Sequence, residues 1–363
     1  MHIQHLHIKN FRCFDNFSLD FINNIALITG ANGSGKSTVL EALHYGCYLR
    51  SFRTHVPREL IRFDDENFFI KIQVQETVNE HAFDHELQVG FSKKKRIIKI
   101  DQKNVTSYKE LSHLYRVITL TEDDLMLIKG SPEGRRLFLD QALALEHPEF
   151  MAHARRYKQI LENRNALLQR GGYTNESYFL WTQQLWQEAL LLQNYRRPLL
   201  ATLEHKTNRM LRDWFGQELS LAFSYQTKKM IKDQSFDEFW DNFGELRTLE
   251  GILKRSLFGA HLDDFSIQFC DKTSRSFASR GQQKLIIMLI KIAQMQEIIA
   301  KNGPTLFLLD DFMTDFDQQR GTVLLSLLFE LKSQLIFTCP TNSGYFENLL
   351  RDYYGAQHII LTP

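Results

Sequence analysis

GANGSGKS, at residues 30–37, is the stretch of sequence that decides the fold. It fits the phosphate-binding pattern of P-loop proteins, G-x-x-x-x-G-K-S, at every fixed position. Residues 25–29 form an apolar run that predicts a buried strand, and residues 37–48 predict a helix. A strand that leads through such a loop into a helix is the context that the motif requires. The sequence therefore predicts an α/β fold that binds a nucleotide.

The residue types in this stretch assign a role to each part of the nucleotide. Glycines let backbone N–H groups curl around phosphate oxygens, and the positive end of the following helix faces the anion. We expect Lys36 to be catalytic and to reach the β- and γ-phosphates, while the Ser37 hydroxyl takes Mg²⁺. ATP and Mg²⁺ are thus the predicted cofactors. The predicted nucleotide ligands are Gly30, Ala31, Asn32, Gly33, Ser34, Gly35, Lys36, Ser37 and Thr38.

A second motif is the acidic stretch LFLLDD at residues 306–311. Its four apolar residues predict a fully buried parallel strand. At the end of that strand we expect Asp310 to hold Mg²⁺, directly or through water. Asp311 stands where a general base could activate the attacking water, and is the second predicted catalytic residue. Since aspartate is one methylene shorter than glutamate, we expect slow hydrolysis.

A third motif, SRGQQK at residues 279–284, precedes a helix that is apolar nearly all round. It resembles the signature motif of ABC-type ATPases. In that class the signature lies too far from its own P-loop, and presents its serine and a helix N-terminus to the γ-phosphate held by a partner subunit. Taken alone, SRGQ is equally compatible with a simple helix cap. The ligands that the resemblance implies are Ser279, Arg280, Gly281 and Gln282.

Other ABC-type elements match less fully. Residues 314–317, TDFD, resemble the D-loop that runs along the dimer interface, and could also be a helix cap. No histidine stands at the switch position after the strand predicted at 335–337, where Thr338, Cys339 and Pro340 are found. Glu122 is our suggested counterpart of the Q-loop glutamine.

The period of the apolar residues divides the chain into three parts. The first 125 residues or so predict mostly strands. Helices are expected at 149–170, at 176–215, where Pro198 should kink or split the helix, and at 236–257. Strands return at 305–309 and 335–337. We therefore predict an ABC-type ATPase head with a mixed sheet, formed by residues 1–130 and 261–363, and an inserted helical lobe at 131–260.

Composition limits the possible partners. The net charge of +1 excludes a polycation, so any DNA-binding surface must be local. Candidates for DNA contact are Arg53, after the P-loop helix, and the run Lys93, Lys94, Lys95 and Arg96; a solvated face is the alternative for each. The four cysteines have no zinc spacing and fit a reducing compartment. Without a signal peptide or a membrane-length apolar run, we expect a cytoplasmic protein with no membrane partner.

Several longer stretches resemble the RecF family of SMC-like ATPases: LHIKNFR at 6–12, RSFRT at 50–54, KGSPEGRRLFLD at 129–140 and RNALL at 164–168, together with SRGQQK and LLDDF. Phe316 in place of the usual D-loop leucine is a mild departure. The resemblance implies ATP-driven homodimerisation with weak ATPase activity, and binding of duplex DNA near single-strand gaps. It also implies a part in recombinational repair, replication restart and the SOS response, in which RecA is loaded together with RecO and RecR.

Two other function classes fit less well. An ABC transporter subunit is the main alternative, but about 240 residues separate Lys36 from Ser279, and the switch histidine is missing. A head fused to a Toprim nuclease would need an acidic domain after the head, and only some 50 residues follow Asp310.

Overall fold

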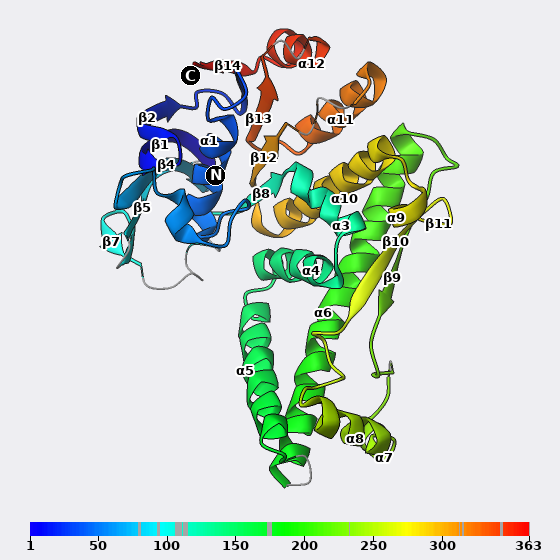
Figure 1. The fold of residues 1–363 in the computed structure, drawn as a ribbon. Coiled ribbons are helices and arrows are strands. Elements are labelled where there is room, and N and C mark those ends of the chain that lie inside the picture. Colours follow the sequence, from blue (N-terminus) through cyan, green and yellow to red (C-terminus); the bar gives the residue numbers. More distant parts are fainter. Residues whose placement is uncertain are drawn as a thin grey trace. The chain divides into compact units, whose positions relative to one another are not determined.

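The computed structural model describes residues 1–78, 81–92, 95–105, 111, 115–172, 176–231, 233–311, 313, 316–341 and 344–362 (Figure 1). The chain divides into two compact units. Unit 1 combines Met1–Asp124 with Gln294–Pro363, and unit 2 is Leu125–Ala293. In the sequence, unit 2 is therefore inserted between the two parts of unit 1. Its end lies beyond residue 260, the predicted limit of the helical lobe, because β10 (Asp264–Phe269) pairs with β9 (Leu221–Gln226) inside unit 2.

A parallel sheet of five strands forms the centre of unit 1. Its order is β14-β3-β13-β12-β8, and every neighbouring pair is parallel. The strands predicted at 25–29, 305–309 and 335–337 are confirmed as β3, β12 and β13, with ends shifted by up to three residues. The strands are β3 (Ile25–Gly30), β8 (Val117–Leu120), β12 (Leu306–Asp310), β13 (Leu335–Pro340) and β14 (Gln357–Leu361).

An antiparallel sheet forms the other layer of unit 1, in the order β2-β1-β4-β5-β6-β7. Ile70, Ile72 and Val74 alternate with exposed or partly exposed neighbours and are buried, as their period predicts. The unit therefore has a parallel and a separate antiparallel sheet rather than one mixed sheet. The strands are β1 (His2–Phe11), β2 (Phe14–Asp20), β4 (Asn67–Val78), β5 (His81–Ser92), β6 (Arg96–Ile100) and β7 (Lys103–Asn104).

Helix α1 (Lys36–Tyr48) contacts strands of both sheets of unit 1. Eleven of its 13 residues are buried, including the charged residues Lys36 and Glu41. A helix in this position has little exposed surface, so each polar side chain on it needs a specific partner. Other helices described in unit 1 are η1 (Pro57–Leu60), η2 (Glu122–Leu125, which ends in unit 2), α11 (Gln318–Glu330), α12 (Tyr345–Asn348) and η4 (Leu349–Tyr353).

Unit 2 is mainly helical, with one small antiparallel sheet in the order β11-β10-β9. Helix α5 packs against the long helix α6, and α4 packs on both α6 and β10. Helix α10 begins in unit 2 and ends in unit 1. The elements are α3 (Met126–Lys129), α4 (Pro132–Glu146), α5 (Phe150–Gln169), α6 (Glu176–Trp214), α7 (Phe236–Asp241), α8 (Gly244–Leu253), β11 (Lys272–Thr273), α9 (Ser274–Phe277) and α10 (Arg280–Asn302).

In unit 2 the helix does not split at Pro198, and residues 236–257 form two helices where one was expected. Helix α6 is a single helix that continues through Pro198. Proline removes the hydrogen bond to the carbonyl of residue i−4, but Pro198 and Asn194 both lie on the exposed face, where water can reach that carbonyl. The helix expected at 236–257 is two helices, α7 and α8, because Phe243 between them turns into the core and stacks on Trp240.

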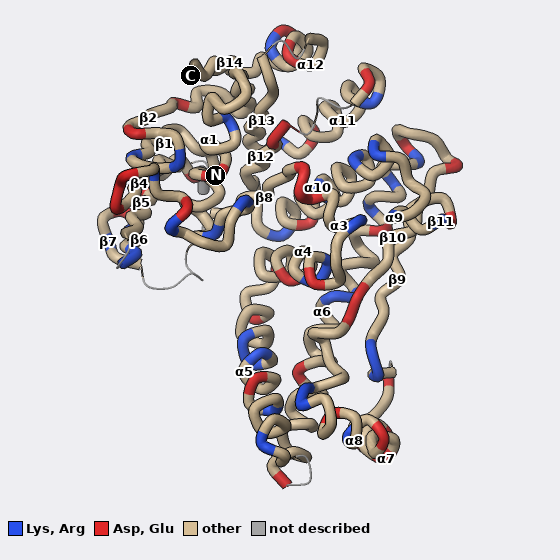
Figure 2. Tube along the Cα trace, viewed as in Figure 1, with Lys and Arg blue, Asp and Glu red and all other residues tan. Residues whose placement is uncertain are grey.

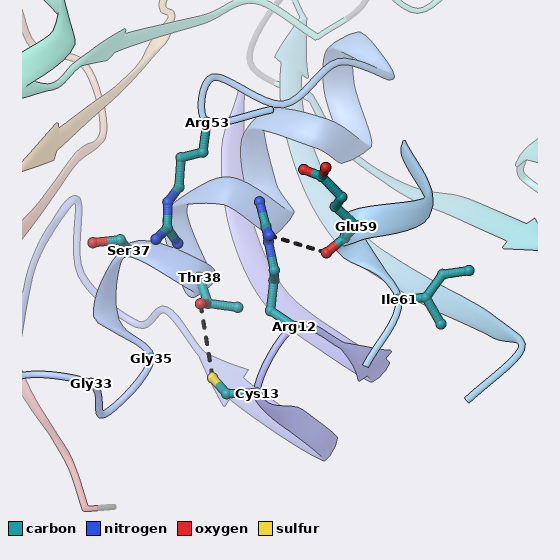
Figure 3. Close-up of a pocket in the computed structure, with 9 residues that line it drawn as sticks. All are labelled: Arg12, Cys13, Gly33, Gly35, Ser37, Thr38, Arg53, Glu59 and Ile61. Atoms are coloured by element: carbon teal, nitrogen blue, oxygen red, sulfur yellow. Dashed lines mark hydrogen bonds between the residues drawn. The ribbon is translucent and has the colours of Figure 1, made fainter. Parts of the chain in front are cut away.

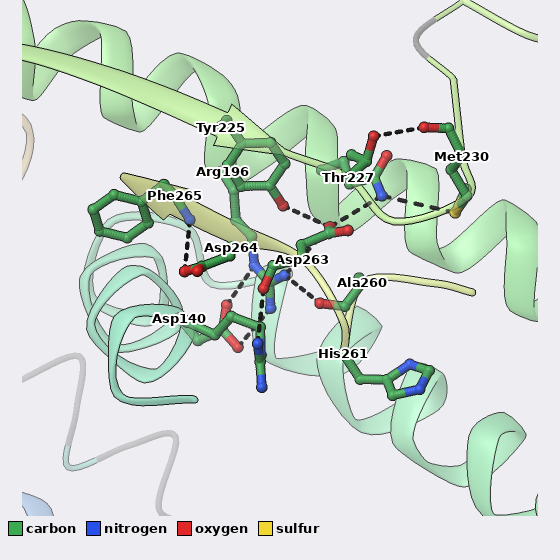
Figure 4. A network of polar contacts seen from close by, with 12 residues as sticks. Asp140, Arg196, Tyr225, Thr227, Met230, Ala260, His261, Asp263, Asp264 and Phe265 are labelled. Carbon is green, nitrogen blue, oxygen red and sulfur yellow. Dashed lines mark hydrogen bonds and ion pairs between the residues drawn. The ribbon is translucent and has the colours of Figure 1, made fainter. Parts of the chain in front are cut away.

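Two of the stretches that resemble the RecF family serve to anchor helices in unit 2. In the first, Arg135 on α4 donates to both carboxylate oxygens of Asp264, at 2.6 and 2.8 Å. On the same helix, Asp140 accepts two hydrogen bonds of 2.9 Å from Arg196 of α6 (Figure 4). Arg196 also donates to the Ala260 carbonyl at 2.8 Å. This network ties α4 and α6 to the chain that enters β10.

The second anchoring stretch contains Arg164 on α5, which is fully buried together with its ion-pair partner Glu250 on α8. The Arg164 guanidinium also donates to Ser256 Oγ at 2.7 Å. It lies 4.6 Å from the ring centroid of Tyr178 and 4.9 Å from that of Phe258. A buried charge that is paired and enclosed by rings holds the tip of unit 2 together.

Among the described residues, no helix combines the length and the apolar character needed to cross a bilayer.

Candidate functional site

The glycine-rich loop at residues 30–35 joins β3 to α1 with the geometry of a phosphate cradle. Gly33 and Gly35 have φ angles of 87° and 97°, in the left-handed region that favours glycine. A Cβ on Gly35 would also lie 2.5 Å from the Phe14 ring. The buried Lys36 ammonium donates to the carbonyls of Gly30 and Ala31, at 3.0 and 3.1 Å, and so lies over the loop. These features fit a bound phosphate anion.

The Ser34 hydroxyl gives a second reason to expect a phosphate at the loop. The Ser34 hydroxyl is buried and has no hydrogen-bond partner within the part of the chain that the structure describes. An unsatisfied buried hydroxyl costs free energy unless a ligand supplies the missing partner. Ser34 lies inside the loop whose backbone turns around it. A phosphate oxygen at the loop would provide such a partner.

The acidic motif meets the loop at the end of the parallel sheet. Ser37 at the start of α1 donates to Asp310 Oδ1 at 2.9 Å. A hydroxyl and a carboxylate are oxygen ligands of the kind that Mg²⁺ prefers, and it usually takes its remaining ligands from phosphates and water. The described residues contain no group of three or more His, Cys, Asp and Glu that could hold a metal ion alone. The pair fits a magnesium ion that arrives with a nucleotide.

Asp311 follows directly and has a strained backbone, with φ at 48°. Burial raises the pKa of its carboxyl above the ordinary value, and the charge of Asp310 raises it further. Glu122, our suggested Q-loop counterpart, raises that pKa slightly through its charge. The structure thus brings Lys36, Asp310 and Asp311 together, as the sequence predicts.

A pocket of about 480 Å³ opens beside the start of α1 (Figure 3). It is lined by P-loop residues and by residues from the β1–β2 turn and the segment after α1. In Figure 3 the Arg53 side chain points toward Ser37 and Thr38. The lining residues are Arg12, Cys13, Gly33, Gly35, Ser37, Thr38, Arg53, Glu59 and Ile61.

Glu41 connects the two arginines of this pocket, and its site role was not predicted from the sequence. It is fully buried on α1, and Arg12 donates to both of its carboxylate oxygens at 2.9 and 2.8 Å. Arg53 Nη1 lies 3.6 Å from Glu41 Oε2, and Ser51 donates to Oε1 in a very short contact. The only sequence signal was that Glu41 is the single acidic residue of α1.

The signature stretch has the geometry of a helix cap. The Ser279 hydroxyl accepts from the Gln282 N–H at 3.3 Å, and the Gln282 side chain accepts from the Ser279 N–H at 2.8 Å. Ser279 and Arg280 are exposed, Gly281 and Gln282 are partly exposed, and a Cβ on Gly281 would meet no atom within 4 Å. The start of α10 is therefore accessible to a ligand or a partner. The motif can be both a helix cap and a signature that meets a nucleotide.

The D-loop candidate is only partly described, because Thr314 and Asp315 lie outside the described residues. Asp317 Oδ1 accepts from the Arg320 N–H at 2.9 Å and caps α11.

The candidate DNA-contact residues differ in their exposure and in the side chains that surround them. Lys93 and Lys94 lie outside the described residues. Lys95 is exposed, and the Arg96 guanidinium lies 5.8 Å from the ring centroids of both Tyr45 and Phe91. Basic and acidic residues are interspersed along both units (Figure 2). Arg53 stands out because 46% of its side chain is exposed while it also lines the pocket beside the start of α1.

Comparisons with known proteins agree with this geometry. The family model described as RecF/RecN/SMC N terminal domain matches residues 2–357. Two relatives are called DNA replication and repair protein RecF. That of Lacticaseibacillus casei is 30% identical, with 96% of each chain covered, and that of Clostridium acetobutylicum is 28% identical, with 99% of this chain and 98% of the relative covered.

Solved structures show the same fold. One is the recombination mediator protein RecF-ATP in the RecFOR pathway, with a TM-score of 0.83 and 23% identity over 94% of this chain and 92% of that one. An Smc head bound to the C-winged helix domain of ScpA has a TM-score of 0.52 and 14% identity, over 96% and 92% of the two chains. With its P-loop head, its inserted helical unit and these full-length matches, the chain belongs to the RecF family of DNA replication and repair proteins.

Proposed function

We propose that this protein is a weak, Mg²⁺-dependent ATPase whose homodimerisation on ATP controls its binding to duplex DNA. One observation carries the proposal: the P-loop, Ser37 and the Asp310–Asp311 pair meet at one edge of the parallel sheet. A chain that only bound a nucleotide would need the loop and the cation site. The additional acidic residue, at a strained backbone position next to the cation site, supports hydrolysis.

In this proposal Gly30 to Thr38 bind the phosphates, and Lys36 neutralises the β- and γ-phosphates. Bound Mg²⁺, held by Ser37 and Asp310, would supply further charge neutralisation on the same phosphates. Asp311 takes a proton from water as the water oxygen bonds to the γ-phosphorus, and the bond from that phosphorus to the β–γ bridging oxygen breaks. The products are ADP and inorganic phosphate. The short aspartate side chain makes turnover slow.

The signature residues act on the nucleotide of a second copy. Ser279, Arg280, Gly281 and Gln282 lie at the accessible start of α10, and helix N-termini favour anions. Two chains would then hold ATP between the P-loop of one and the signature of the other. This arrangement makes dimerisation depend on the γ-phosphate.

The DNA role follows from family membership and from Arg53. Duplex DNA near single-strand gaps is the proposed ligand, with contacts from Arg53, Lys93, Lys94, Lys95 and Arg96. The protein would act in the cytoplasm in recombinational repair and replication restart, and help to load RecA with RecO and RecR. The placement of a related structure in the RecFOR pathway supports these partners.

Solution mass and duplex binding test this proposal. Both are measured without nucleotide, with ADP and with a slowly hydrolysed ATP analogue, at several salt concentrations. The analogue should double the mass, tighten duplex binding and steepen the salt dependence, because each neutralised phosphate adds roughly 0.9 to the slope of log affinity against log salt. Equal mass, affinity and slope in all three states would refute the proposal.

A pair of arginine variants locates the DNA surface. Arg53→Ala should weaken duplex binding for all sequences and make the salt slope shallower, since no base is read. Arg351→Ala is the matched control, because the Arg351 side chain is equally exposed, at 46%, and pairs with its neighbour Asp352. An Arg53→Ala protein that binds like the control would remove Arg53 from the DNA surface.

A further inference from the structure

Thr338 occupies the place where the switch histidine of transporter ATPases is expected, and the proposed mechanism leaves it without a role. It lies on β13, directly beside the end of β12, with Thr338 in register with Asp310. Its side chain is almost fully buried, at 2% exposure. A threonine that replaces a catalytic histidine could be only a space-filling residue. Its hydrogen bonds indicate more.

The Thr338 hydroxyl contacts both members of the acidic pair. Oγ1 lies 2.8 Å from Asp310 Oδ1 and 3.3 Å from Asp311 Oδ1. It also accepts a hydrogen bond of 3.0 Å from the Asp311 backbone N–H. One hydroxyl therefore fixes the left-handed backbone of Asp311 and reaches the carboxylates of both aspartates.

A hydroxyl has one proton, so it can fully donate to only one carboxylate at a time. The shorter distance, 2.8 Å against 3.3 Å, favours donation to Asp310. Asp310 Oδ1 also accepts from Ser37 at 2.9 Å, so two hydroxyls share one carboxylate oxygen. A cation bound by Ser37 and Asp310 would compete for the same oxygen lone pairs. The Thr338 proton would then have a second acceptor within reach, on Asp311.

We propose that Thr338 is a positioning residue that transfers its hydrogen bond from Asp310 to Asp311 when the cation site is filled. The general base is thus oriented toward the attacking water only after the metal-bound nucleotide has arrived. This inference rests on the proposed ATPase function, and assigns to Thr338 the coupling between the cation site and the base. It gives the chain a substitute for the missing histidine.

Three variants test this coupling. Thr338→Val keeps the shape and removes the hydroxyl, and Thr338→Ser restores it. Thr119→Val is the matched control, because Thr119 is a buried threonine on β8, the other neighbour of β12, and bonds to His44 instead of the acidic pair. For each variant we would measure kcat and KM for ATP, the thermal midpoint without ligand, and hydrogen exchange of the Asp311 amide. Mn²⁺ affinity with a slowly hydrolysed ATP analogue would be measured by electron paramagnetic resonance.

Thr338→Val should lower kcat roughly ten- to a hundred-fold, the effect of losing a hydrogen bond to a charged group, with KM and Mn²⁺ affinity nearly unchanged. Exchange of the Asp311 amide should become faster. Thr338→Ser should recover most of both properties, and Thr119→Val should behave like the wild type.

Three results would overturn the inference. One is an unchanged kcat in Thr338→Val while the wild type hydrolyses ATP. Another is a loss of Mn²⁺ affinity in Thr338→Val as large as the loss of kcat, since Thr338 would then only support the metal ligand. The third is unchanged exchange of the Asp311 amide, which needs no ATPase activity. A wild type that binds but never hydrolyses ATP would instead refute the proposed function.

Discussion

Replacing Glu250 by glutamine should destabilise unit 2 strongly, because it leaves a buried cation without its counter-charge. Arg164 and Glu250 are both fully buried, and Arg164 Nη1 lies 3.2 Å from Glu250 Oε1. Each Glu250 oxygen now accepts from the guanidinium and from one other donor, the Leu257 N–H at Oε1 and the Tyr178 hydroxyl at Oε2. The NH2 group of a glutamine would therefore face N–H or O–H donors at either position. Removing one partner of a buried ion pair costs about 3–5 kcal/mol. That is a large part of the stability of a typical domain.

Intrinsic fluorescence is a suitable assay, since all four tryptophans, Trp181, Trp186, Trp214 and Trp240, belong to unit 2. Urea unfolding would be compared among the wild type, Glu250→Gln and Glu245→Gln, an exposed position on the same helix. We expect a loss of about 3–5 kcal/mol for Glu250→Gln and almost none for the control. Equal unfolding free energies for the two variants would show that the buried pair does not stabilise the unit.

Three further predictions concern the nucleotide site. Lys36→Ala should abolish ATP binding while leaving the fold intact, as measured by equilibrium binding and circular dichroism; unchanged affinity would contradict the P-loop assignment. Asp311→Asn should bind ATP, stop turnover and keep the dimer in a mass measurement, and a wild-type rate would mean that the base lies elsewhere. A mixture of Ser279→Arg and Lys36→Ala chains should recover measurable ATPase that each variant lacks alone. Proven heterodimers with no activity would indicate that each chain hydrolyses ATP by itself.

The sequence predicts those parts of the site that are formed by residues adjacent in the chain. The P-loop between residues 30 and 37 and the acidic strand that ends at Asp310 each depend on their own neighbours. Local spacing therefore predicts their strands, their helix and their position at the carboxyl edge of a parallel sheet. The contact of 2.9 Å between Ser37 and Asp310 follows from that shared edge.

Contacts between residues that lie far apart in the chain could not be predicted from one sequence alone. Nothing near Glu41 indicates that Arg12, 29 positions earlier, would form its bidentate partner. Nothing near Thr338 indicates that its hydroxyl would reach two aspartates 28 and 27 positions before it. The register of β12 against β13 creates those contacts, and register depends on the whole sheet.

The stretch at residues 164–168 could be recognised from the sequence, but its role in the structure could not. It contributed to the resemblance to the RecF family, but its two polar residues bond to other residues of unit 2. Arg164 pairs with Glu250, and Asn165 accepts hydrogen bonds of 2.8 Å from both the N–H and the hydroxyl of Ser256. A family-specific sequence can therefore record a fold requirement, and only the positions of its partners distinguish this from a ligand site.

The pairing of β3 has a consequence for how the protein is made. Its two neighbours, β13 and β14, begin at Leu335 and Gln357, whereas β3 begins at Ile25. A ribosome that adds about 5–20 residues per second needs roughly 15–60 s to make the 310 positions from Ile25 to Leu335. During that time the apolar P-loop strand has two open edges, which are sites for wrong pairing and for chaperones. The strand that leads into the P-loop therefore gains both of its neighbours only after the segment through Leu361 has been made.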